Sequence, residues 1–479
     1  MAHDPAVLGE SEALVGAELP VRAHRASFRD RAGFVFERDG VVYRQVNAAG
    51  ARDYDWLLSS GLYGRLTADG DLIPHVETTV NASPDGAAHQ VITPERVEFI
   101  SYPYEWCFGQ LRDAALLTLR LQKTAMAHGM SLKDATPFNV AFRRGRPIWI
   151  DTLSFERRPE GRPWVAYAQF CQMLLAPLAL MSQVDVRLLQ LLRTSLDGIP
   201  LDLASSLLPA RTRLRPGLLM HLHLHAAAQR RVRDTTPARA AGRSMSAAAL
   251  TGIIDSLTRT VEALTWGGAR TTWGSYYEAT NYTDTAFTHK RQIVESVIAR
   301  ISPSTVWDLG ANDGTFSRLA SASGIPTVAF DIDPVAVEKN YRRVVDTADP
   351  YLLPLLMDLT NPSGASGWAN EERDTLAMRG PADLVLALAL VHHLAIGHNV
   401  PLPRIAEYLA RLASSLVIEF VPKGDSQVQR MLASRVDVFD DYSQARFEQA
   451  FNPWFEIETA IPVAEAVRTV YVMKRRTGR

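Results

Sequence analysis

Glycines and an acidic residue surround the end of a short apolar segment in the C-terminal half of the chain. Asp308 lies within the segment 306–309 (VWDL), and Gly310, Asn312 and Gly314 follow it. Glycine lets a backbone turn sharply and approach a ligand without a Cβ in the way, and asparagine tolerates left-handed angles better than most residues. Asp308 can accept a hydrogen bond from a cationic ligand amine. The pattern predicts a strand, a tight ligand-binding turn and a helix.

Two further acids end the next two apolar segments. Asp331 follows TVAF, and Asp358 follows LLPLLM. An acid roughly twenty residues after a glycine turn can hold both hydroxyls of an unphosphorylated ribose. A carboxylate at the third position could accept the exocyclic amine of an adenine. Ligands of open α/β sheets bind at the carboxyl ends of the strands, so the three acids predict separate contacts to an amine, a ribose and a base.

Two adjacent histidines follow a fourth apolar segment. His392 and His393 come directly after ADLVLALALV. A histidine near its ordinary pKa can take a proton from a hydroxyl group, which makes both residues candidates for a catalytic base. The alternative is that they only pack against and cap the end of the strand.

Alternation of strand-like and helical segments predicts the architecture that must position these residues. From about residue 270 the apolar segments are TVWDLG, TVAFDI, LLPLLMDL, ADLVLALAL, SLVIEFV and TVYVMK. Short apolar runs separated by helical patterns are typical of a parallel sheet flanked by helices. The aromatic-rich segment 273–284 precedes the first strand. It is expected to fold over the ligand, either stabilising a cation through its ring faces or acting as a lid that excludes water.

The motifs DLGANDG, FDIDP, MDL and ADLVLALALVHHL, in this order, resemble those of class I S-adenosylmethionine-dependent methyltransferases. The resemblance covers about 200 residues up to the C-terminus. It implies a Rossmann-like seven-stranded α/β fold, S-adenosyl-L-methionine as cofactor, and methyl transfer to an acceptor that the sequence does not identify. It also implies that Asp308, Gly310 and Gly314 cradle the methionine moiety, that Asp331 binds ribose and that Asp358 meets adenine.

One position departs from this family pattern. Asn312 stands where the family has a middle glycine, and we keep it among the expected cofactor-binding residues. A dehydrogenase or a sugar-nucleotide enzyme of the Rossmann type would prefer G-x-G-x-x-G, which the spacing of Gly310 and Gly314 does not give, and no P-loop lysine follows. The whole chain also resembles the bacterial nodulation protein NoeA-like methyltransferases.

A second constellation lies in the N-terminal half. Asp134 and Asn139 are five residues apart, and a predicted strand then leads to Asp151. This arrangement is similar to the catalytic loop and metal-binding aspartate of kinases. The resemblance implies a base at Asp134 and magnesium ligands at Asn139 and Asp151. However, no glycine-rich loop precedes the hairpin expected around residues 34–46, and Arg44 replaces the usual lysine. The expectation is a kinase-like fold without efficient phosphoryl transfer; the alternative is an accessory domain in which the acids cap turns.

Three histidines alternate with leucine in the sequence HLHLH. On a strand, His221, His223 and His225 would share one face and could bind a metal. The surrounding residues favour a helix, and no acid or thiol completes the set. We therefore assign no metal site.

Composition narrows the possible partners. The chain has 479 residues, with 51 Lys and Arg against 52 Asp and Glu, giving a net charge of −1. Such a balance gives no electrostatic argument for nucleic acid or membrane as a partner. The two cysteines, Cys107 and Cys171, cannot build a disulfide framework. The longest apolar run, 170–181, is too short to span a bilayer, so we expect a cytoplasmic protein of unassigned oligomeric state.

Composition also predicts four regions of the chain. They are an N-terminal extension (1–29), an accessory domain of α+β and helical character (30–225), an Arg- and Ala-rich linker (226–246) and the methyltransferase domain (247–479). The alternative to an enzyme is a binding or regulatory protein whose N-terminal part recruits a partner, or a bifunctional phosphotransferase.

Overall fold

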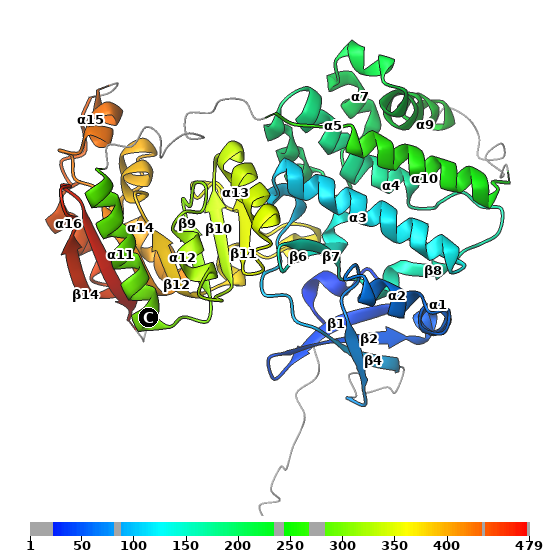
Figure 1. Ribbon diagram of the computed structural model, residues 1–479, viewed down its shortest axis with the longest axis horizontal. Coiled ribbons are helices and arrows are strands. Elements are labelled where there is room, and N and C mark those ends of the chain that lie inside the picture. The colour runs from blue at the N-terminus through cyan, green and yellow to red at the C-terminus, as the bar shows by residue number, and fades with distance from the viewer. Residues whose placement is uncertain (1–22, 81–87, 234–243, 268–282, 434–435, 477–479) are drawn as a thin grey trace, which may run out of the picture. The chain divides into compact units, whose positions relative to one another are not determined.

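The computed structural model describes residues 23–80, 88–233, 244–267, 283–433 and 436–476 (Figure 1). The chain forms two compact units, each described here by itself. The first combines Met1–Ala51 with His75–Pro94, and the second combines Arg52–Pro74 with Glu95–Arg479.

The first unit is built on a four-stranded antiparallel sheet in the order β1-β2-β4-β3. Asp39 and Gly40 have φ angles of 54° and 75°, the left-handed pair that a two-residue hairpin turn requires, so the predicted hairpin is confirmed. Phe36 is fully buried and stacks on Tyr43 across this hairpin. The elements are η1 (Arg25–Ser27), β1 (Gly33–Arg38), β2 (Val41–Asn47), β3 (His75–Thr78) and β4 (Ala88–Pro94).

A long buried helix and two short strand pairs open the second unit. Helix α3 buries residues along its whole length. Strand β5 pairs with β8 and β6 pairs with β7, both antiparallel. The bounds here are α1 (Ala48–Ser59), α2 (Leu62–Ala68), η2 (Pro103–Glu105), α3 (Phe108–Ala127), β5 (Met130–Leu132), η3 (Pro137–Asn139), β6 (Val140–Arg143), β7 (Arg146–Trp149), η4 (Thr152–Ser154) and β8 (Phe155–Arg157).

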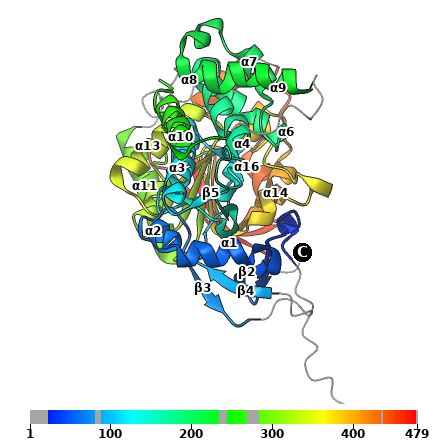
Figure 2. The same ribbon diagram turned by 90° about the vertical axis from the view of Figure 1, so that its right-hand side faces the viewer.

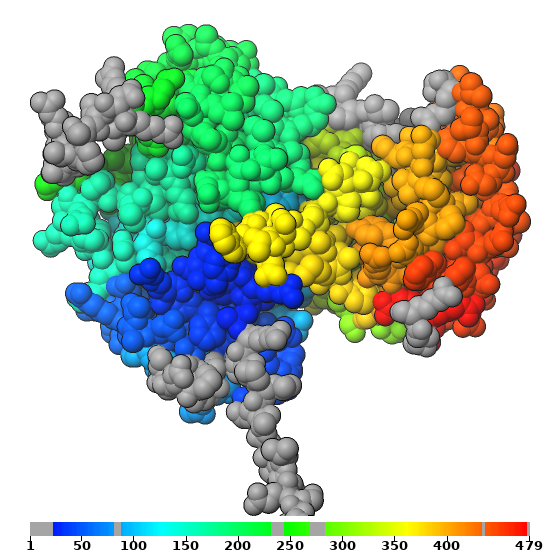
Figure 3. Space-filling model, turned by 180° about the vertical axis from the view of Figure 1, so that it is seen from behind, coloured from blue at the N-terminus to red at the C-terminus, as the bar shows by residue number. Residues whose placement is uncertain are grey.

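A helical region follows, as the composition predicted. The apolar run 170–181 forms a buried helix that passes from a π-helical to an α-helical stretch. Helices α7 and α9 lie at the top of Figure 1, α8 joins them at the top of Figure 2, and this region forms the green surface at the top of Figure 3. The elements are α4 (Tyr167–Phe170), η5 (Cys171–Leu175), α5 (Ala176–Gln183), η6 (Val186–Gln190), α6 (Leu191–Thr194), α7 (Leu201–Leu207), η7 (Ala210–Leu214), α8 (Pro216–Leu218), η8 (Leu219–Leu224), α9 (His225–Arg233) and α10 (Ala247–Glu262).

The region predicted as a linker has helices at both of its ends. Helix α9 occupies its first residues, and α10, placed in the methyltransferase domain by composition, packs on α3 instead. Lys123 of α3 forms an ion pair of 2.7 Å with Asp255 of α10. The four regional limits stay a prediction, although this packing associates α10 with the helical region.

A seven-stranded sheet dominates the C-terminal half in the order β11-β10-β9-β12-β13-β15-β14. The first five strands are parallel, β15 pairs antiparallel with β13, and β14 pairs antiparallel with β15. All six predicted apolar segments are strands of this sheet, and the α/β fold is confirmed. Its strands are β9 (Val306–Leu309), β10 (Thr327–Asp331), β11 (Leu352–Leu356), β12 (Ala382–Ala387), β13 (Ala413–Phe420), β14 (Phe455–Pro462) and β15 (Thr469–Arg475).

Helices flank this sheet, which explains its nearly continuous apolar strands. The core strands β9 and β10 are buried at every residue, as expected where both faces of a parallel sheet are covered. The helical elements are α11 (Asp284–Ile301), α12 (Ser317–Ser321), α13 (Pro334–Thr347), η11 (Trp368–Asn370), η12 (Ala377–Arg379), η13 (His393–Gly397), α14 (Leu402–Leu412), α15 (Ser426–Leu432) and α16 (Gln444–Phe451).

Polar contacts join the start of α3 to the seven-stranded sheet within the second unit. Gln110 donates from Nε2 to the carbonyl of Pro354 at 2.9 Å. The backbone N–H of Gly109 donates to Glu338 Oε2 at 2.8 Å. The buried Glu105 and Arg379 form a bidentate ion pair with distances of 2.6 and 2.9 Å. The two halves of the chain therefore share a core.

Candidate functional site

The glycine turn after β9 has the backbone geometry that its sequence predicted. Gly310, Asn312 and Gly314 have φ angles of 78°, 51° and 80°. The N–H groups of Gly310 and Ala311 both donate to the carbonyl of Phe330, each at 2.9 Å, which ties the turn to β10. Asn312 thus takes the left-handed conformation that the missing glycine would have supplied.

Gly314 also meets a steric requirement. A Cβ built there would approach Asn340 Nδ2 to 2.4 Å and Arg318 Nη1 to 2.6 Å. Arg318 in turn donates to the side chain of Asn340 at 2.8 Å and to the carbonyl of Asp313 at 2.7 Å. A side chain at position 314 would therefore disturb both the turn and this support.

Asp331 closes the turn from the neighbouring strand. Its Oδ2 accepts the N–H of Asn312 at 2.7 Å, and its Oδ1 accepts the N–H of Asp333 at 2.8 Å. The side chain is 8% exposed. Burial raises the pKa of this carboxyl to about 6, against the hydrogen bonds that favour its charged form.

Asp308 lies beneath the turn. Ser317, at the start of α12, donates its hydroxyl to Asp308 Oδ2 at 2.6 Å. Burial raises the pKa of Asp308 to about 7, and the nearby Asp331 raises it further. This hydrogen bond ties the carboxyl of Asp308 on β9 to the first turn of α12.

The raised pKa values predict how cofactor affinity depends on pH. Each buried carboxylate costs folding free energy above its folded pKa, and the cost is relieved as the pH falls toward the unfolded value near 4. A ribose or amine contact needs the ionised form. We therefore expect the affinity for S-adenosylhomocysteine to be about tenfold weaker at pH 5 than at pH 8, measured by calorimetry. Asp331→Asn should remove the part of this dependence that Asp331 contributes and leave the part due to Asp308. Equal wild-type affinity at both pH values would refute the prediction.

Asp358 is placed differently from the other two acids. It follows β11, is half-buried, and its Oδ1 accepts the N–H of Thr360 at 2.8 Å and the Thr360 hydroxyl at 2.6 Å. The N–H of the preceding Met357 donates to the carbonyl of Asp331 at 2.8 Å. Asp358 thus caps a turn that follows β11, at the same carboxyl edge of the sheet where Asp331 ends β10.

The histidine pair follows β12. His392 is 1% exposed, and within the described part of the chain its Nδ1 has no hydrogen-bond partner. The rings of His392 and His393 lie 4.1 Å apart. Burial lowers the pKa of His393 to about 4 and that of His392 well below its usual range. Both rings are therefore neutral near pH 7, and the lowered pKa makes each a weaker proton acceptor than a histidine near its ordinary value.

A buried group of charges that the sequence analysis missed borders the histidines. Lys290 of α11 pairs with Glu419 of β13 at 2.7 Å. Arg468 contacts Asp425 through Nε at 2.7 Å and Nη2 at 3.1 Å. Burial lowers the pKa of Lys290, which Glu419 partly offsets. The positive charges of Arg468 and Lys290 also lower the pKa of His392, which places this charged group beside it.

A sequence signal for these charges exists. Lys290 takes a position on the apolar stripe of α11 that Ala286, Ile293 and Val297 also occupy. Glu419 stands inside the apolar strand β13. A charged residue on an otherwise buried face predicts a partner charge, although it does not say which residue supplies it.

The kinase-like loop forms a closed hydrogen-bonded cluster. Asn139 donates from Nδ2 to Asp134 Oδ2 and to Ser154 Oγ, both at 3.2 Å. Gln169 donates to Asp134 Oδ1 at 2.7 Å, and Ser154 donates to Asp151 Oδ2 at 2.5 Å. Asp134 and Asp151 also cap local turns through the N–H groups of residues 136 and 153. The structure thus brings the three predicted residues together and gives the two acids the capping contacts of the alternative interpretation.

The histidines of the HLHLH segment are structural. They lie in or next to the helix η8, as the sequence favoured. His221 contacts the Tyr167 hydroxyl at 2.8 Å and Ser256 at 3.0 Å, and His225 stacks on Tyr167. No group of three metal-ligating side chains occurs among the described residues.

The predicted aromatic segment 273–284 lies outside the described residues except for its last two positions.

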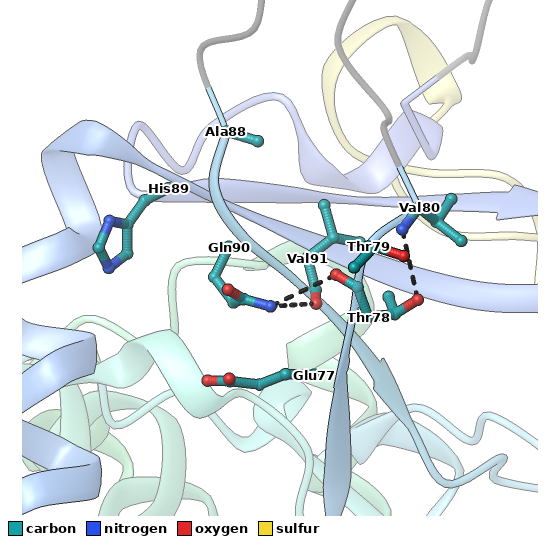
Figure 4. Close-up of a pocket in the computed structure, with 8 residues that line it drawn as sticks. All are labelled: Glu77, Thr78, Thr79, Val80, Ala88, His89, Gln90 and Val91. Carbon is teal, nitrogen blue, oxygen red and sulfur yellow. Dashed lines mark hydrogen bonds between the residues drawn. The ribbon is translucent and has the colours of Figure 1, made fainter.

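A hollow elsewhere carries none of the predicted residues. It has a volume of about 780 Å³ and lies at the adjoining ends of β3 and β4 (Figure 4). Gln90 there donates to the carbonyls of Thr78 and Val91.

Among the described residues, no helix has the length and apolar character needed to cross a bilayer.

The C-terminal sheet and its turn define the class of this protein. The seven-stranded order, the glycine turn after β9 and the carboxylate at the end of β10 are what the family resemblance implied. The chain has the fold of the class I S-adenosylmethionine-dependent methyltransferases.

Comparison with known proteins identifies the family. No protein-family model matches the chain. It is 34% identical over 475 residues to nodulation protein NoeA of Rhizobium meliloti (strain 1021), covering 98% of this chain and 99% of that relative. The chain therefore belongs to the nodulation protein NoeA family.

Solved structures resemble part of the chain more distantly. WbdD is 13% identical over 42% of each chain, with a TM-score of 0.31. Magnesium protoporphyrin IX methyltransferase (ChlM) from Synechocystis PCC 6803, with bound S-adenosylhomocysteine, is 17% identical over 43% of this chain and 93% of its own, also with a TM-score of 0.31. Scores this low add no weight to the class, which rests on the sheet and its turn.

Proposed function

We propose that S-adenosylmethionine binds at the carboxyl ends of β9, β10 and β11 and that the chain transfers its methyl group to a hydroxyl acceptor. The observation that carries the proposal is the glycine turn, held in left-handed geometry and closed by Asp331 through the N–H of Asn312. Gly310 and Gly314 would leave room for the methionine moiety, with Asp308 near its amine. Asp331 would hold the ribose and Asp358 the adenine.

Bound there, the cofactor would supply a methyl group on a sulfonium, so the protein's work is mainly to orient an acceptor in line with it. His392 and His393 follow β12, and their rings are neutral near pH 7. Their lowered pKa values make both rings weak bases, so either would take the proton of an acceptor hydroxyl only as the methyl group is transferred. The hydroxyl can belong to a small molecule, a glycan or a protein.

A labelled methyl group tests this function. We expect full-length chain incubated with methyl-labelled S-adenosylmethionine and fractionated bacterial extract to transfer label to one fraction. Asp331→Ala should lose the transfer, and His392→Gln should reduce it while leaving cofactor affinity unchanged. A methyl ether withstands base, whereas a methyl ester is hydrolysed, so base treatment identifies the chemistry. Label that is wholly base-labile, or transfer unaffected by Asp331→Ala, would contradict the proposal.

The N-terminal half is proposed to be kinase-like and to contribute recognition rather than phosphoryl transfer. Helix α3, strand β5, the loop from Asp134 to Asn139 and the hairpin β6–β7 follow one another along the chain, which supports this proposal. Its acids are engaged in caps, and the sequence lacks a glycine-rich cradle for triphosphate. We expect no steady ATP turnover with magnesium. Turnover abolished by Asp151→Asn would instead establish a phosphotransferase.

A further inference from the structure

An exposed apolar surface lies on the outer helices of the helical region. Leu214 is 85% exposed, Leu224 57%, Met220 44%, and Leu203 and Leu207 are each 41% exposed. Among the residues that the structure describes, exposed leucines occur only here. Scattered apolar residues on a surface need no explanation, but a group of them marks an interaction site.

One buried histidine joins the three segments that carry these residues. His223 of η8 contacts Ser205 of α7 at 2.8 Å through Nδ1 and Thr212 of η7 at 2.9 Å through Nε2. Burial lowers the pKa of His223, so the linking ring is neutral. The two hydrogen bonds hold α7, η7 and η8, which carry the exposed side chains, against one another.

Exposed side chains of each helix share one face. Leu203 and Leu207 are four residues apart on α7, and Met220 and Leu224 are four apart on η8. The buried residues Ala204 of α7 and Leu222 of η8 face the core instead. Helices α7, α8 and α9 lie at the outer edge of the helical region in Figure 2.

Positive charge accompanies this apolar face. Arg211, Arg213 and Arg215 alternate through and beyond η7 and are all exposed, with Leu214 between the last two. Arg230 of α9 is exposed as well. The sequence from residue 203 to residue 230 contains no Asp or Glu, although the whole chain is nearly neutral. We call the group the arginine–leucine surface; its members are Leu203, Leu207, Arg211, Arg213, Leu214, Arg215, Met220 and Leu224.

We propose that the arginine–leucine surface binds the face of an anionic lipid bilayer. Leucine and methionine side chains can enter the boundary between headgroups and acyl chains, and arginines beside them can pair with lipid phosphates. Nucleic acid would use the arginines but would leave the exposed leucines in water. The surface would hold the protein at a membrane without any spanning segment.

Vesicle sedimentation tests the proposal with the full-length protein. The probes are vesicles of phosphatidylcholine alone and vesicles containing phosphatidylglycerol. We expect binding only to the anionic vesicles, weakening with salt. The variant Leu214→Ser/Leu224→Ser should bind about tenfold less tightly. Replacing Arg211, Arg213 and Arg215 by Gln should weaken binding by about fivefold per arginine.

Matched controls separate this surface from general stickiness. Val438→Ser removes an apolar side chain that is 71% exposed elsewhere, and Arg343→Gln removes an exposed charge on α13. Both should bind like wild type, and unfolding temperatures should agree for all variants. Absence of binding to anionic vesicles at low salt, or binding that neither test variant weakens, would overturn the proposal. Binding to single-stranded DNA that survives the leucine substitutions would point to a simple polyanion site and overturn it as well.

Discussion

Asp331→Ala is expected to weaken S-adenosylhomocysteine binding by about ten- to 150-fold at pH 8, equivalent to about 1.5–3 kcal/mol for hydrogen bonds to a charged group. The carboxylate is the proposed acceptor of the ribose hydroxyls. It also accepts the N–H groups of Asn312 and Asp333, so its loss loosens the glycine turn. Calorimetric titration of the full-length variant measures the effect.

A matched acid and an isosteric variant complete this experiment. Asp346 is exposed on α13 and takes no part in the turn, so Asp346→Ala should bind like wild type. Asp331→Asn keeps one oxygen acceptor and should fall between wild type and Asp331→Ala. Unchanged affinity in a folded Asp331→Ala protein would show that the cofactor does not bind at this turn.

Among the substitutions proposed here, Arg379→Met should cause the largest loss in the free energy of unfolding. Arg379 and Glu105 are 5% and 1% exposed at their side chains, and Arg379 also lies over the rings of Phe99 and Tyr102. Removing one partner of a buried ion pair leaves an uncompensated charge, which costs about 3–5 kcal/mol. We expect the free energy of unfolding in urea to fall by this amount.

An exposed pair provides the comparison for Arg379. Arg404 is 74% exposed and pairs with Glu407, so Arg404→Met should cost no more than about 1 kcal/mol. The double variant Glu105→Leu/Arg379→Met should be more stable than the single variant, because it removes the stranded carboxylate as well. If Arg379→Met is as stable as Arg404→Met, the ion pair between Glu105 and Arg379 contributes little to the free energy of unfolding.

Local signals explain why the geometry of the glycine turn could be predicted from the sequence. The positions of Gly310, Gly314 and Asp331 follow from short-range rules, in which glycine permits positive φ and an acid ends an apolar strand. The structure places them as expected, and Asn312 takes its left-handed angle. Strand β14 gave no such signal, because most of its residues are polar or exposed and it depends on pairing with β15.

Long-range contacts explain what the sequence could not show. Glu105 and Arg379 are 274 residues apart, and Lys290 and Glu419 are 129 apart. Each partner alone is an ordinary charged residue, and only the fold brings the pair together. Helix α10 shows the same limit: the amphipathic pattern of a helix does not reveal which neighbour it packs on, and in the structure α10 packs on α3.

Calorimetric titration of S-adenosylhomocysteine into the full-length wild-type chain at pH 8 tests the central claim most directly. The proposed site predicts saturable binding of one molecule per chain. Binding should be lost or strongly weakened by Asp331→Ala and unaffected by Asp346→Ala. No heat of binding at millimolar ligand, from protein shown to be folded, would contradict the assignment of the glycine turn as a cofactor site.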